Sequence, residues 1–182
     1  METKKPTIKG MFVNSHLKTL VKAKGKWALL ALQKAYGKPL KFSNLQDVPV
    51  REEIKIIEHC LDLTAKKPVP PEARSYEAGR LHFTNFVTTP FANILFSQFK
   101  KQFKMLMMLS GKIAGHVFNG VEFESQDTGS TSVKVTMKNN DYPIDHFRGF
   151  FQEWMNYSGL VGEVKAKEAA PNIFEYEIAW KK

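Results

Sequence analysis

The densest run of apolar residues in the chain lies between Pro90 and Leu109. Apolar side chains recur there at spacings of three and four, the helical period, at Phe91, Ile94, Leu95, Phe96, Phe99, Phe103, Leu106 and Met107. Thr89 and Pro90 are typical of a helix start, because the Thr oxygen accepts an amide hydrogen of the first turn and Pro has no donor to leave unpaired. The run is interrupted by Lys100, Lys101 and Lys104, which argues against a membrane span. We expect one helix over 90–109, at the centre of a folded domain.

Four shorter helical patterns precede this run, over 14–24, 27–36, 50–65 and 72–87, and a short apolar strand is expected over 8–13. In the third pattern Ile54, Ile57 and Leu61 are assigned to the inner face. The residues assigned to the solvent face are Arg51, Glu52, Glu53, Lys55 and Glu58. Gly79 interrupts the fourth pattern at a cost of about 1 kcal/mol relative to Ala. We therefore expect close packing against a neighbouring element at Gly79.

The last third of the chain changes character. Apolar and polar residues alternate over 121–126 and 132–138, and again over 161–167 and 173–180, which predicts two β-hairpins. A helical pattern over 143–158 separates them, with Phe147, Phe151 and Trp154 on its inner face. The fold class is α+β: an N-terminal helical layer packed on a small antiparallel sheet, built from a hairpin-helix-hairpin C-terminal unit. Residues 1–7 are expected to form a flexible leader, and residues 8–182 a single domain.

Composition and charge narrow the class of protein. Of the 182 residues, 43% are hydrophobic and 25% are charged, which is typical of a globular chain. A single cysteine, Cys60, excludes an internal disulfide, and no signal-peptide pattern follows Met1, so we expect a cytoplasmic protein. Residues 1–50 carry a net charge of +8, residues 51–113 of +4 and residues 114–182 of −3. The basic first third could attract an acidic protein or nucleic acid, or could be a solvated surface.

No catalytic or metal-binding motif stands out. The histidines are scattered along the chain, with no pair at i,i+4, at positions His16, His59, His82, His116 and His146. Cys60 follows His59, but neighbouring helix positions point about 100° apart, so the thiol is interpreted as part of the core. Phosphate-binding glycine loops are also absent from the sequence. We expect no metal site and no enzymatic activity.

Three segments resemble a known family. They are Lys9–Val13 (KGMFV), Pro71–Arg74 (PEAR) with the following Gly79-Arg80, and Phe174–Trp180 (FEYEIAW). Together they resemble an uncharacterised protein family best represented in myxobacteria. The order of elements is also similar to the superfamily of haem–nitric-oxide-binding domains, vinyl-reductase-like ligand-binding domains and TRAPP vesicle-tethering subunits. This resemblance implies a sensor or assembly module with an apolar pocket, and implies a homodimer.

The resemblance also raises two covalent or cofactor hypotheses. A haem sensor of the superfamily has a proximal His on a helix and a Tyr-x-Ser-x-Arg triplet. His116 and His146 are the candidate ligands, but the triplet does not occur, so we expect no haem. In the TRAPP-like branch a helix cysteine carries a long acyl chain, which makes Cys60 a candidate for acylation.

The sequence thus favours a non-enzymatic cytoplasmic regulatory or sensory module, with a small apolar ligand between helices and sheet. The expected pocket residues are Phe83, Phe96, Phe99, Phe103, Met107, Phe147, Phe151 and Trp154. Met side chains are flexible and polarizable and can line an adaptable pocket, although they can equally fill a core. The alternative is a structural module that uses the basic residues 1–50 to bind an acidic protein or nucleic acid.

Overall fold

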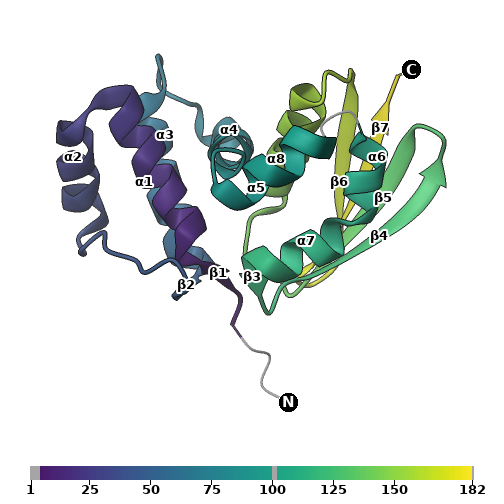
Figure 1. Ribbon diagram of the computed structural model, residues 1–182, viewed down its shortest axis with the longest axis horizontal. Helices are drawn as coiled ribbons and strands as arrows, with labels where there is room; N and C mark the ends of the chain where they lie inside the picture. The colour runs from purple at the N-terminus through teal and green to yellow at the C-terminus, as the bar shows by residue number, and fades with distance from the viewer. Residues whose placement is uncertain (1–4, 100–101, 182) are drawn as a thin grey trace.

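The computed structural model describes residues 5–99 and 102–181. Its helices are α1 (Gly10–Lys24), α2 (Lys26–Tyr36), α3 (Val50–Thr64), α4 (Pro71–Phe86), α5 (Pro90–Phe99), α6 (Phe103–Met108), α7 (Ser110–Val117) and α8 (Ile144–Tyr157). Its strands are β1 (Thr7–Lys9), β2 (Asp47–Pro49), β3 (Phe118–Asn119), β4 (Glu122–Gly129), β5 (Ser132–Lys138), β6 (Gly162–Ala170) and β7 (Ile173–Trp180). Figure 1 shows α1, α2 and α3 on one side of the molecule and the larger sheet on the other, with α4 and α8 between them.

The larger sheet confirms the predicted α+β class. Its strand order is β4-β5-β7-β6, and every neighbouring pair is antiparallel. The two predicted hairpins therefore lie side by side, joined through β5 and β7. Alternate side chains of these two strands are buried, at Val133, Val135, Met137, Phe174, Tyr176 and Ile178. Helices α6, α7 and α8 pack on the sheet, whereas α1 and α3 pack on α4.

A second, small sheet was not predicted. Strand β1 pairs with both β2 and β3, so the start of the chain is tied to residues 47–49 and 118–119. Thr7, which the sequence analysis placed in the leader, pairs with Pro49 and Asn119. The predicted strand over 8–13 is wrong beyond Lys9, because helix α1 already begins at Gly10. At that point the Gly10 amide donates to the Gln46 carbonyl, and the chain turns.

The prediction of one central helix over 90–109 is wrong. The segment forms α5 and α6, and α7 begins directly after it at Ser110. A turn in which the Gln102 amide donates to the Phe99 carbonyl ends α5. Lys100 and Lys101, which also belong to that prediction, lie outside the described residues. Ile94, assigned to the apolar stripe, is 64% exposed, because α5 lies at the surface. The chain changes direction within this segment, so its apolar residues reach parts of the core that one straight helix could not reach.

The central elements are α4 and α8, which cross at two glycines. A Cβ atom at Gly79 would overlap the carbonyl oxygen of His146, and one at Gly149 would overlap that of Tyr76. The predicted close packing at Gly79 is therefore confirmed, since only a residue without a side chain lets the two backbones approach so far. The crossing brings His82, one turn beyond Gly79, beside His146.

Among the residues that the structure describes, no helix combines the length and the apolar character that crossing a bilayer requires.

Candidate functional site

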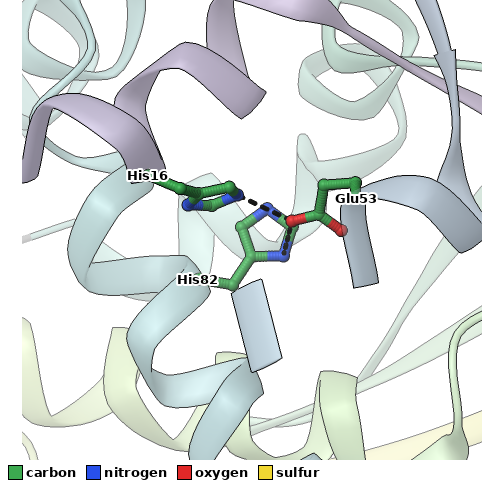
Figure 2. Close-up of side chains that lie close together, drawn as sticks. All are labelled: His16, Glu53 and His82. Carbon is green, nitrogen blue, oxygen red and sulfur yellow. Dashed lines mark hydrogen bonds and ion pairs between the residues drawn. The ribbon is translucent and has the colours of Figure 1, made fainter. Parts of the chain in front are cut away.

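Three titratable side chains from three different helices converge between α1, α3 and α4 (Figure 2). The Nε2 atom of His16 lies 2.6 Å from the Oε1 atom of Glu53, and the Nδ1 atom of His82 lies 3.7 Å from the same oxygen. Each of the three side chains is at most 1% exposed. Their donor atoms all lie within 4.8 Å of one another, which is within reach of a single metal ion.

The cluster extends at both ends. The Nδ1 atom of His82 lies 2.9 Å from the Nε2 atom of His146 on α8, and the Nδ2 atom of Asn85 lies 2.9 Å from the Nδ1 atom of His16. Asn85 and His146 are both 1% exposed. Five polar side chains thus form a continuous buried path from α1 through α3 and α4 to α8. We call these residues, His16, Glu53, His82, Asn85 and His146, the polar cluster.

Two buried polar atoms of the polar cluster have no hydrogen-bond partner among the described residues. They are Asn85 Oδ1 and His146 Nδ1, whereas the Tyr142 hydroxyl and the Glu53 carboxylate interact with each other. A buried polar atom without a partner costs about 1–3 kcal/mol, so two in one place are unusual in a stable core. The arrangement is that of a site with room for something that supplies partners, such as water or a cation.

Burial sets the protonation of the cluster. It lowers the pKa of His82 to about 3, against a partial upward effect of the Glu53 carboxylate, and lowers the pKa of His146 to about 3. Both imidazoles are therefore neutral at pH 7. Burial alone raises the pKa of Glu53, but its electrostatic interactions with His82 and His16 and its side-chain hydrogen bonds with His16 and Tyr142 outweigh burial and hold this pKa below its ordinary value. Glu53 is a buried carboxylate.

The sequence pattern did not indicate this cluster. The prediction that Glu53 faces water is wrong, because Glu53 is 0% exposed. A signal was present: Glu53 falls on the same helical stripe as Val50, Ile57 and Cys60, all of them buried. His16 likewise falls between Phe12 and Leu20 on α1. A titratable residue at an apolar stripe position, repeated on separate helices, is the pattern that could have indicated a shared buried site.

A second feature is an apolar cavity of about 30 Å³ beside the polar cluster, between α4, α7, α8 and the start of the larger sheet. It is lined by His82, Phe86, Ser110, Ile113, Ala114, Val117, Phe118, Phe123, Phe147, Phe150, Phe151 and Trp154. His82 thus belongs both to the polar cluster and to the wall of the cavity. Apart from His82 and Ser110, the lining is aromatic or aliphatic.

The residues expected to line a pocket are divided between this cavity and the packed core. Phe147, Phe151 and Trp154 line the cavity. Phe83, Phe96 and Phe103 instead surround the Trp154 ring, with centroid distances of 5.8, 5.4 and 6.1 Å. Met107 is fully buried in the same core, and Phe99 packs on its edge. The structure thus brings these residues together, but only part of the set faces the cavity.

Cys60 lies on the buried face of α3 and is 1% exposed. Burial, with a further contribution from the Glu53 carboxylate, raises the pKa of its thiol to about 12. The thiol is therefore protonated at pH 7, and it is not among the residues that line the cavity.

The fold is similar to that of several solved H-NOX structures. One, described as a study of the molecular mechanism of H-NOX activation, has a TM-score of 0.67 at 15% identity and covers 96% of this chain and 97% of its own. The Fe(II) unliganded H-NOX protein from K. algicida has a TM-score of 0.63 at 12% identity, with the same coverage. An oxygen-binding H-NOX domain related to soluble guanylate cyclases has a TM-score of 0.60 at 16% identity, covering 96% and 95%. At such identities the likeness shows the fold alone.

The residues of this chain do not fit a haem. A cavity of about 30 Å³ is far below the roughly 300–1,000 Å³ of ordinary ligand and cofactor pockets. His116 is exposed and packs its ring on Phe91, and the Nε2 atom of His146 is already bonded to His82. Neither candidate histidine lines the cavity.

Comparison of the sequence with known families gives one match. No curated protein matches the chain. A family model described as a protein of unknown function, DUF2378, matches residues 2–181. Since the match extends over nearly the whole chain, this protein belongs to the DUF2378 family.

Proposed function

We propose that this chain is a non-enzymatic regulatory or sensory module that binds a small apolar ligand in the cavity between α4, α7, α8 and the sheet. The observation that carries the proposal is the apolar lining around about 30 Å³ of space, with His82 in its wall. One water molecule needs about 10–15 Å³ of such space, and apolar cavities of this kind stay dry and accept apolar guests. The ligand we expect has only a few non-hydrogen atoms.

The position of His82 gives such a ligand a route to the rest of the molecule. A ligand in the cavity would contact the imidazole whose Nδ1 atom lies 2.9 Å from His146 and 3.7 Å from Glu53. Binding would then favour one arrangement of the polar cluster over another. A sensory role requires this kind of differential contact between two arrangements.

The comparisons support the class of function. The chain shares its fold with domains described as H-NOX proteins, one of them as oxygen-binding. Small-ligand binding in a domain of this architecture is therefore a reasonable expectation, although the present residues do not fit a haem. The homodimer and the cytoplasmic location stay predictions.

The proposal is tested with xenon, an apolar atom that occupies such cavities. Xenon added to the whole chain should shift NMR signals of residues around α7 and α8. Ala114→Val places two extra carbons in the cavity wall and should abolish the shifts. Ala23→Val makes the same change on the exposed face of α1 and should leave them intact. Shifts that survive in Ala114→Val, or an absence of shifts in the unaltered chain, would refute the proposal.

A second candidate function rests on α2. Trp27 and Leu30 are 59% and 70% exposed, and Lys26 and Lys34 lie on the same helix. An exposed indole beside lysines suits an acidic partner, either a protein or a nucleic acid. Binding to short duplex DNA should be measured over a salt series in the unaltered chain, in Trp27→Ala and in the control Leu45→Ala. Binding that is lost by physiological salt and is equal in all three would leave only a nonspecific basic surface.

A further inference from the structure

The Glu53 carboxylate is fully buried, and it interacts with the imidazoles of His16 and His82 and with the Tyr142 hydroxyl. A buried charge without a partner of opposite charge is strongly destabilising, so a positive charge must lie beside it. Two sources are available in this geometry. One is a proton held between Glu53 and His16, and the other is a metal cation held by the same atoms.

We propose that His16 Nε2, Glu53 Oε1 and His82 Nδ1, which all lie within 4.8 Å of one another, form a binding site for one divalent transition-metal ion of the Zn²⁺ type. The site draws its donors from three helices, α1, α3 and α4. It is separate from the apolar cavity, which it touches only through His82, and it does not depend on a ligand being bound there.

The interatomic distances suit such an ion. Around a tetrahedral Zn²⁺ with bonds of about 2.0–2.1 Å, neighbouring donor atoms lie roughly 3.3 Å apart. The Oε1 atom of Glu53 lies 2.6 Å from His16 Nε2 and 3.7 Å from His82 Nδ1. These two distances bracket the tetrahedral value, and all three donor atoms lie within 4.8 Å of one another.

The supporting residue also fits. Metal-bound histidines usually donate their second ring N–H to an oxygen, which fixes the ring and leaves the first nitrogen free for the metal. The Asn85 side chain lies against His16 Nδ1, and its Oδ1 atom has no partner among the described residues. A half-turn of the Asn85 amide, which exchanges two atoms of nearly identical size, would let Oδ1 accept the Nδ1–H of His16. Asn85 is therefore the positioning residue of the proposed site.

The donor set selects the class of metal. Neutral imidazole nitrogens with one carboxylate oxygen suit Zn²⁺, Co²⁺, Ni²⁺ and Cu²⁺, whereas Ca²⁺ and Mg²⁺ prefer oxygen donors throughout. Cys60 is not among the residues whose donor atoms lie together at the site, so the donor set contains no sulfur.

Zinc binding by the whole chain provides the test. The chain, freed of metal by a chelator, is titrated with Zn²⁺, and the stoichiometry is read by native mass spectrometry. We expect one Zn²⁺ per chain, with affinity at least about 100-fold lower in Glu53→Gln and about 10–100-fold lower in Asn85→Ala. His116→Gln removes an exposed histidine and should leave the affinity unchanged.

A measurement on the unaltered chain guards against variants that fail to fold. Co²⁺ bound in place of Zn²⁺ should give X-ray absorption and visible spectra of a nitrogen and oxygen shell with imidazole ligands and no sulfur. The proposal is overturned if the unaltered chain retains no Zn²⁺ or Co²⁺, because the cation beside Glu53 is then a proton. It is equally overturned if Glu53→Gln binds as tightly as the unaltered chain, or if the spectra show a thiolate ligand.

Discussion

His82 lies between two regions of opposite character, the apolar cavity and the polar cluster. On one side, aromatic side chains such as Phe147 and Phe151 pack loosely enough to leave a cavity, and no charge is present in its lining. On the other, the polar cluster fills its space with imidazoles, an amide and a carboxylate, and leaves polar atoms without partners. The apolar side thus contains unfilled space, and the polar side contains buried polar atoms without hydrogen-bond partners.

This difference indicates where a ligand of each kind would bind. Apolar lining makes an empty space tolerable, because no polar group there loses its hydration. Unpartnered buried polar atoms are costly, and a bound cation or water relieves the cost. Both regions depend on the crossing of α4 and α8, which places His82 beside His146. Changes to the apolar side, to the crossing and to the polar side should therefore have separable effects.

The largest expected effect is on the apolar side. Phe147 is 1% exposed, and its ring contacts Tyr142, Phe150 and Phe151 at centroid distances of 5.1, 5.2 and 5.6 Å. Phe147→Ala should lower the free energy of unfolding by about 3–5 kcal/mol, because it removes a buried ring and enlarges the cavity. Urea denaturation measures the loss.

Phe99→Ala is the control for that change, since Phe99 is partly buried and does not line the cavity. Its loss should be clearly smaller. Equal losses in the two variants would mean that the packing around the cavity is no more important than that at the surface of α5.

The second largest effect is expected for a change at the crossing of α4 and α8. Gly79→Ala places a Cβ atom onto the His146 carbonyl, so α4 and α8 must move apart, and we expect a loss of about 3 kcal/mol in the free energy of unfolding. Because the shift moves α4, and with it His82, relative to His16 and Glu53, it should also weaken Zn²⁺ binding. Gly115→Ala on α7 meets no atom within 4 Å and should stabilise the chain by about 0.5–1 kcal/mol. Denaturation curves that coincide for the two variants would contradict the described crossing.

The smallest of the three effects is on the polar side, where the free energy of unfolding should depend on pH. His82 and His146 have a pKa of about 3 in the folded chain, below the ordinary value of about 6.5, so between these values the unfolded chain binds more protons. Stability must then fall as pH falls through 6.5. From pH 7.5 to 5.5, with metal removed, we expect a loss of about 2–3 kcal/mol for the two groups together.

Urea denaturation at the two pH values measures this loss. Surface carboxylates do not confuse the result, because a carboxyl such as Asp47, whose pKa the Lys9 hydrogen bond lowers, loses its stabilisation only at lower pH. A free energy of unfolding that is equal at pH 7.5 and 5.5 would show that the buried imidazoles are not neutral.

The extent to which the sequence predicts this molecule varies along the chain. In the last third the two hairpins and α8 lie close to the predicted ranges, because each strand and helix there has one clear apolar face. Over 90–109 the prediction failed, because a nearly continuous apolar run shows that residues are buried without showing where the chain bends. The short strands β2 and β3 were also missed, and the strand predicted at β1 was extended too far, since two or three residues carry no measurable period.

The sequence by itself thus determined the α+β class, most of the helices and strands, and the glycine at which α4 meets α8. Only the tertiary structure decided that His16, Glu53, His82 and His146 share one buried place, since they are far apart in the sequence and come from four helices. The physical reason is that periodicity reports which face of an element is buried, but not which other face it meets. The role of a charged residue on an apolar stripe depends on its partners, and only the packing of the helices determines these partners.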